Sequence, residues 1–127
     1  MSYFFANPNP KNNNVIDCVI RAICIATNRS WHDVYFDICA EGGVLCDMPS
    51  SNRVWKSYLL SIGFKMEMIP NTCPDCYTIA EFARDHPSGT YILCTGEHAV
   101  CVMDGNYYDT WDSGNQVPLY YFYKERK

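Results

Sequence analysis

The chain has 127 residues and a formal net charge of −4, and 48% of its residues are hydrophobic. This length predicts one globular domain over residues 1–127, and the acidic balance without a basic stripe argues against a nucleic-acid partner. No apolar run approaches the roughly 18 residues of a membrane-spanning helix. The polar segment 1–14 also lacks the pattern of a signal peptide, so we expect a cytoplasmic protein with no membrane partner.

Residues 1–14 are expected to form an extended or loop arm, and four helices are predicted after it. The first is apolar nearly all round apart from Arg21, which indicates a buried helix. Ser30 is a suitable N-cap for the second, which Gly42-Gly43 should end, and Thr78 with Glu81 matches a capping box for the fourth. The predicted ranges are Asp17 to about Thr27, Trp31 to about Ala40, Asn52 to about Ser61, and Ile79 to about Asp85.

Strands follow from alternation of apolar and polar residues, first between the third and fourth helices and then throughout the second half of the chain. Asp104-Gly105-Asn106 is predicted to be a tight hairpin turn. Helices followed by an antiparallel sheet predict an α+β domain whose two halves pack face to face. The predicted strands are Phe64 to Ile69, Thr90 to Cys94, His98 to Met103, Tyr107 to Trp111, and Pro118 to Tyr123, the first of them half-buried.

Cys18 and His98 are the first two candidate catalytic residues. A thiolate is the nucleophilic form of cysteine, and the positive end of a helix together with an imidazole lowers the pKa of a thiol. Cys18 stands at the start of the first predicted helix, and His98 begins a core strand. The two should meet where the helices pack on the sheet, with His98 activating the thiol and protonating the leaving group.

A carboxylate on the next strand should orient His98, and the length of the hairpin turn decides which one. If Asp104-Gly105-Asn106 is a three-residue loop, the ladder places His98 opposite Asp112. A two-residue turn would put Asp109 on the face of His98, but displaced along the strand by roughly 7 Å or further. Asp112 is therefore the first choice and Asp109 the alternative.

An oxyanion formed during acyl transfer needs hydrogen-bond donors. The backbone N–H of Cys18, at a helix start, could supply one. A side-chain donor should come from just upstream, and Asn12, six residues before Cys18, is the candidate.

The order Cys18, His98-Ala99-Val100, a glycine turn and Asp112-Ser113 resembles that of the papain-like cysteine peptidases, whose His-Ala-Val strand leads to an Asn-Ser pair. Asp17-Cys18 is similar to the Asp-Cys of the bacterial peptidases that cleave double-glycine leaders, and to small papain-fold proteins of bacteria and phages. Those families carry a glutamine where Asn12 stands, and the double-glycine peptidases a glycine where Val19 stands. The resemblance implies a papain-like fold and a peptide or protein substrate.

The leading hypothesis is a cysteine hydrolase that cleaves a peptide or amide bond through a thioester. Deamidation or acyl transfer on the same fold, and a non-catalytic interaction protein, are the alternatives. We expect no cofactor.

Seven further cysteines raise other possibilities. Cys73 and Cys76 form a Cys-x-x-Cys pair, but no second pair completes a zinc site, although Cys46 and His86 could contribute. We therefore expect no metal. Cys73 and Cys76 should lie in a loop, where a disulfide could form between them. The others include four in apolar patterns, which should pack as small hydrophobic residues: Cys24, Cys39, Cys94 and Cys101.

Overall fold

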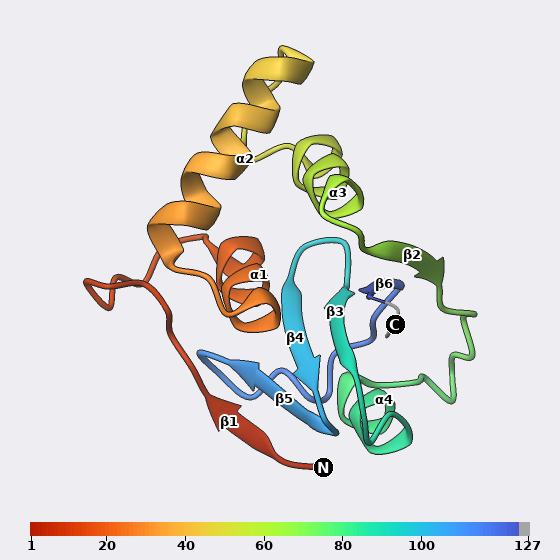
Figure 1. Cartoon of the computed structure of the whole chain (residues 1–127). Helices are drawn as coiled ribbons and strands as arrows, with labels where there is room; N and C mark the ends of the chain where they lie inside the picture. Colours follow the sequence, from red (N-terminus) through yellow and green to blue (C-terminus); the bar gives the residue numbers. More distant parts are fainter. Residues whose placement is uncertain (125–127) are drawn as a thin grey trace.

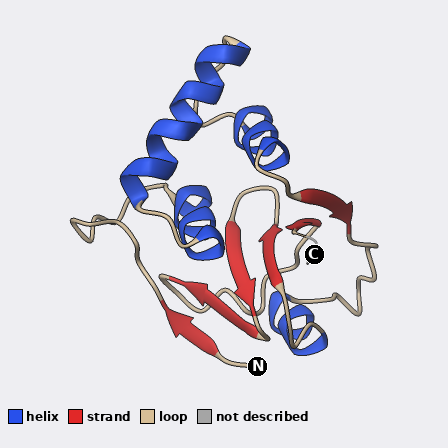
Figure 2. Ribbon diagram, in the orientation of Figure 1, coloured by secondary structure: helices blue, strands red, loops and turns tan. Residues whose placement is uncertain are grey.

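The computed structural model describes residues 1–124. Over this range the fold is α+β, and helices cover both faces of a six-stranded mixed sheet (Figures 1 and 2). None of the helices in this part of the chain has the length and hydrophobicity needed to cross a membrane. The helices are α1 (Cys18–Thr27), α2 (Trp31–Leu45), α3 (Asn52–Ser61) and α4 (Ile79–Asp85). The strands are β1 (Tyr3–Phe5), β2 (Lys65–Met68), β3 (Thr90–Cys94), β4 (Ala99–Met103), β5 (Asn106–Asp109) and β6 (Tyr120–Tyr123).

The strand order is β1-β5-β4-β3-β6-β2, with β1 parallel to β5 and the remaining pairs antiparallel. Successive side chains of a strand point to opposite faces, so β3 and β4 contribute to two cores. Ile92 and Cys101 face the core formed with α1, α2 and α3, whereas Leu93 and Val100 face the core formed with α4. The central pair β3 and β4 is therefore fixed from both sides.

The starts of α2 and α4 were predicted correctly from their capping residues. The Ser30 hydroxyl accepts a hydrogen bond from the backbone of Asp33, and Thr78 accepts one from Glu81, as the capping box predicts. The predicted end of the second helix is wrong, because α2 runs through both glycines to Leu45. Gly42 instead allows a close approach of the following loop, since a Cβ there would lie 2.8 Å from the carbonyl oxygen of Asp47.

Two other expectations need correction. The arm 1–14 contains β1, which joins the sheet beside β5, so the sheet is mixed and not purely antiparallel. Strand β2 is an edge strand whose four residues are all exposed, so its expected half-burial is wrong. Its flanking residue Phe64 is the buried one.

The hairpin between β4 and β5 has a two-residue turn, not the three-residue loop of the first-choice prediction. Met103 pairs with Asn106, and Asp104 and Gly105 form the turn with φ angles of 50° and 82°. Positive φ at both central residues is typical of the type I′ hairpin turn. This register decides which carboxylate can reach His98.

Substitution of Gly105 by alanine should lower the free energy of unfolding by about 1–2 kcal/mol, measured by urea denaturation. Alanine is strained at a positive φ, and its Cβ would lie 3.3 Å from the Cα of Pro87. Gly43→Ala is the control with the opposite sign, because a Cβ there meets nothing within 4 Å and alanine favours a helix by about 0.5–1 kcal/mol. A neutral Gly105→Ala variant would contradict the assigned turn.

Candidate active site

Cys18 is the first residue of α1, directly after the N-cap Asp17. Its half-buried thiol is hydrogen-bonded to His98 and to the backbone of Ala99 at the start of β4. The structure therefore brings together the two residues that the sequence predicted as nucleophile and base, from segments about eighty residues apart in the chain.

His98 directly precedes β4 and is held by its own backbone and by an aromatic ring. Its N–H donates to the Thr95 hydroxyl over 3.1 Å, and its carbonyl accepts from the Thr95 N–H over 2.9 Å. The Trp111 ring lies against the imidazole, with 5.0 Å between the ring centroids. Since Nε2 faces Asp109, Nδ1 is the ring nitrogen left for Cys18.

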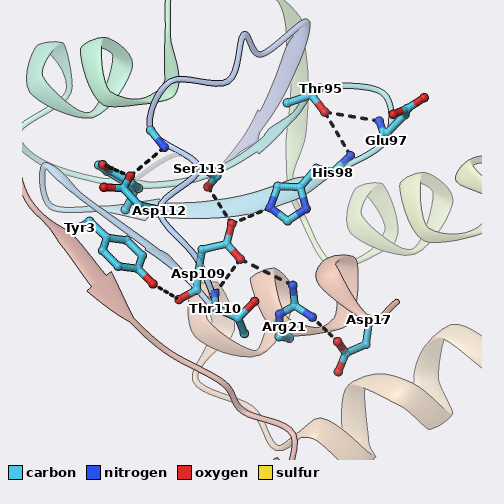
Figure 3. A network of polar contacts seen from close by, with 12 residues as sticks. Tyr3, Asp17, Arg21, Thr95, Glu97, His98, Asp109, Thr110, Asp112 and Ser113 are labelled. Atoms are coloured by element: carbon cyan, nitrogen blue, oxygen red, sulfur yellow. Dashed lines mark hydrogen bonds and ion pairs between the residues drawn. The ribbon is translucent and has the colours of Figure 1, made fainter. Parts of the chain in front are cut away.

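Asp109, the last residue of β5, is the carboxylate that contacts His98 (Figure 3). His98 Nε2 lies 2.5 Å from Asp109 Oδ2, and the same oxygen accepts a hydrogen bond from the Ser113 hydroxyl over 2.7 Å. The other oxygen, Oδ1, accepts from the backbone N–H of Thr110 over 2.8 Å. Both oxygens of this buried carboxylate are thus satisfied.

The first-choice prediction of Asp112 as the partner of His98 is contradicted by this geometry. Asp112 is exposed, and its Oδ1 accepts from the Tyr107 hydroxyl and from the backbone N–H of Gly114. Continuing the observed register places Trp111 opposite His98 and Asp109 diagonal to it. The side chains of a diagonal pair can span that separation, so the expected displacement of Asp109 does not keep it out of reach.

Opposing effects of burial and charge set the ionisation of the site. Burial raises the pKa of Cys18, but the hydrogen bonds from His98 and Ala99 outweigh it, and the net pKa lies below the usual 9.0. Burial would lower the pKa of His98, yet its bonds to Asp109 and Cys18 raise it to about 9. Burial likewise raises the pKa of Asp109, but the hydrogen bonds from His98 and Ser113 hold it below 3.8. The site favours charged forms of all three residues.

A cavity of about 320 Å³ opens beside the thiol and the imidazole. Most of its wall is apolar and is formed by residues of α1, α2 and the start of α3, together with Tyr120 of β6. Glu97, at its rim, is an exposed carboxylate, and none of the lining residues is Lys or Arg. The lining residues are Ile16, Asp17, Cys18, Val19, Ile20, Tyr35, Ile38, Cys39, Pro49, Ser50, Asn52, Trp55, Cys94, Gly96, Glu97, His98, Ala99 and Tyr120.

Asn12, the predicted side-chain donor to an oxyanion, lies in an exposed loop with a φ of 52° and outside the residues that line the cavity. The prediction is not supported by this placement, because the loop turns at Asn12, whose N–H donates to the carbonyl of Asn9. The amide side chain that does line the cavity is Asn52, whose Oδ1 accepts from the Trp55 indole. The backbone N–H of Cys18 lies in the first turn of α1, where N–H groups have no partner within the helix.

The remaining cysteines differ from Cys18. Cys24, Cys94 and Cys101 are buried in the core, as predicted, and burial raises the pKa of Cys24 to about 11 and that of Cys94 to about 12. Cys39 is half-buried and lines the cavity. Cys73 and Cys76 are joined by a disulfide in the loop before α4, as the sequence allowed.

Sequence reasoning missed two contributors to the site. Trp111 could have been placed against His98 only with the correct hairpin register. Arg21 did carry a signal, as the single charge in an otherwise apolar helix, three residues after Cys18. It lies between Asp17 and Asp109.

Comparison of the chain with protein-family models, with curated proteins and with solved structures finds no match.

Substitution of Asp109 by asparagine should slow alkylation of Cys18 by iodoacetamide at pH 6 by about tenfold, the effect of one pKa unit on the thiolate fraction. The amide removes the charge that keeps His98 protonated. Asp112→Asn is the matched control and should leave the rate unchanged, because Asp112 contacts Tyr107 and not His98. Peptide mapping by mass spectrometry measures both rates, and a larger effect at Asp112 would contradict the assignment.

Proposed function

We propose that this protein is a papain-like cysteine hydrolase that cleaves a peptide or amide bond. The observation that carries the proposal is the continuous hydrogen-bonded series from Cys18 to His98 to Asp109, in which the pKa of the thiol is lowered. The order of elements is consistent with it, since the nucleophile starts a helix and the base and the carboxylate follow on adjacent strands.

The reaction would begin with attack of the Cys18 thiolate on the carbonyl carbon. As the tetrahedral intermediate collapses, the C–N bond breaks, His98 gives a proton to the leaving amine, and a thioester on Cys18 remains. Water then attacks the thioester while His98 takes its proton. Cleavage of the C–S bond releases the acid and restores the thiolate and the imidazolium, with Asp109 holding the ring throughout.

The cavity beside the thiol suits an uncharged apolar side chain adjacent to the scissile bond. Its volume of about 320 Å³ is at the small end of the range for ligand sites. A carboxylate buried in this apolar space would lack a free cationic partner, because the lining contains no Lys or Arg and its one cation, His98, is already paired with Asp109 and Cys18. The neighbouring charge of Glu97 disfavours an acidic group further.

In the wild-type protein, iodoacetamide at pH 6 should label Cys18 at least tenfold faster than Cys39 or Cys46, because His98 beside Cys18 favours its thiolate. His98→Ala should remove this preference. His32→Ala is the control, since His32 is exposed on α2. Labelling of Cys18 that is no faster than at the other thiols, or that persists in His98→Ala, would contradict the catalytic function.

Intact-mass measurement on a protein substrate separates hydrolysis from the alternative, deamidation. Chain cleavage supports the peptidase function, whereas a gain of about one dalton without cleavage would show that a side-chain amide is the substrate.

Filling the cavity should change selectivity without changing the reactivity of the thiol. Peptidyl chloromethyl ketones with Leu or Phe next to the reactive group should label wild-type Cys18 roughly tenfold to a hundredfold faster than the Asp analogue, the value of burying such a side chain. Cys39→Trp, on the cavity wall, should remove most of this preference while the iodoacetamide rate stays constant. Ala40→Trp, exposed on the same helix, is the matched control and should keep the preference.

A further inference from the structure

Arg21 lies between two buried carboxylates at the base of the site (Figure 3). It forms an ion pair with Asp17, four residues earlier, and its Nη2 lies 3.6 Å from Asp109 Oδ1. The side chains of Arg21, Asp17 and Asp109 are only 9%, 3% and 2% exposed. The group is therefore almost completely removed from water.

We propose that Arg21, anchored by Asp17, is a positioning residue that fixes the carboxylate of Asp109 and through it the imidazole of His98. This inference rests on the proposed hydrolase function and adds a residue that acts without touching the substrate. Its basis is the placement of one buried cation against two buried anions.

Charge balance supports this role. An ionised carboxylate removed from water is costly unless it is paired and hydrogen-bonded. Asp109 has His98 on one oxygen, and on the other it has the Thr110 N–H and the guanidinium of Arg21. Without Arg21, Asp17 would lose its cationic partner, and Asp109 would keep only His98 as a cation and be less firmly held.

The anchor of Arg21 is itself fixed from two directions. Asp17 Oδ2 accepts a hydrogen bond from the Trp31 indole of α2 over 2.9 Å and from the Asn9 amide of the arm over 3.4 Å. Arg21 also donates to the carbonyl of Val15 over 3.5 Å. Both the arm and α2 thus hold Arg21 in place.

Helix geometry explains how one turn of α1 carries both the nucleophile and the residue that positions Asp109. Residues three and four apart lie on the same face of a helix, so the first turn of α1 carries Cys18 and Arg21 side by side, with Asp17 at its start. Cys18 contacts His98 while Arg21 reaches Asp109. The nucleophile and the residue that positions the carboxylate therefore belong to the same turn of α1.

Other titratable groups also face this cluster. Tyr3 of β1 donates its hydroxyl hydrogen to the carbonyl of Asp109 over 3.2 Å. Asp112 and Glu97 lie on the segments next to Asp109 and His98, and both are exposed. The buried charges in contact with Asp109 are thus those of Arg21 and His98.

The test uses Arg21→Met, which keeps an apolar stem and removes the charge, with two measurements. One is the pH dependence of Cys18 alkylation by iodoacetamide, and the other is the pKa of His98 from its NMR titration. If Arg21 positions Asp109, the bond from Asp109 to His98 weakens, so the pKa of His98 should fall while that of Cys18 rises. The alkylation rate at pH 6 should fall about threefold to tenfold, and Arg21→Lys should restore part of it.

Arg29→Met is the matched control, because Arg29 forms an ion pair with Asp37 that is well exposed. It should leave both pKa values unchanged. If Arg21→Met does not fold, Asp17→Asn removes the anchor with an isosteric side chain and should shift the two pKa values in the same directions.

Two results would overturn the positioning role. Unchanged pKa values with only a lower melting temperature would make Arg21 purely structural. A rise in both pKa values together would show that Arg21 acts through its charge alone, since loss of a nearby cation raises the pKa of every neighbouring group. Absence of preferential Cys18 labelling in the wild-type protein would instead overturn the proposed function, so the two failures are distinguishable.

Discussion

The buried carboxylate of Asp109 is the constraint on which the arrangement of the site depends. A carboxylate that is 2% exposed must be satisfied at both oxygens. Its partners come from separate parts of the chain: His98 before β4, Ser113 after β5, and Arg21 of α1. Satisfying this one charge fixes the orientation of the imidazole, folds the segment after β5 back on itself, and fixes α1 against the sheet.

The sequence was sufficient where the signal is local. Caps and apolar periodicity predicted the four helices and most strands. The positions of Cys18 at a helix start and His98 at a strand start predicted that the two side chains would lie together. The choice of carboxylate required the hairpin register, and Asp104-Gly105-Asn106 is compatible with both turn lengths. A one-residue difference in register exchanges the faces of a strand, which is why Asp112 was preferred over Asp109. Strand β1 was missed because three residues in a polar arm show no pattern, and only the contact with β5 makes them a strand.

Burial raises the pKa of several thiols here, so burial alone does not identify a nucleophile. Cys94 and Cys18 both line the cavity and both experience desolvation. The pKa of Cys94 is raised to about 12, whereas that of Cys18 is lowered, because only Cys18 has the imidazolium of His98 and a backbone N–H directed at its sulfur. Among the buried or half-buried thiols, an opposite charge within hydrogen-bonding distance is what separates a reactive group from a packing group.

The same pKa shifts connect the reactivity of the site to the stability of the fold. His98 has a folded pKa of about 9, above its ordinary 6.5, so its contribution to stability is complete below pH 6.5 and is lost as the pH rises through 9. Asp109 has a lowered pKa, so its contribution is present above its ordinary 3.8 and is lost as the pH falls below that value. The lowered pKa of Cys18 means that folding also favours its thiolate. Around neutral pH the native state therefore stabilises His98 as the imidazolium and Asp109 as the carboxylate, and the fold favours the ionised pair that nucleophilic attack requires.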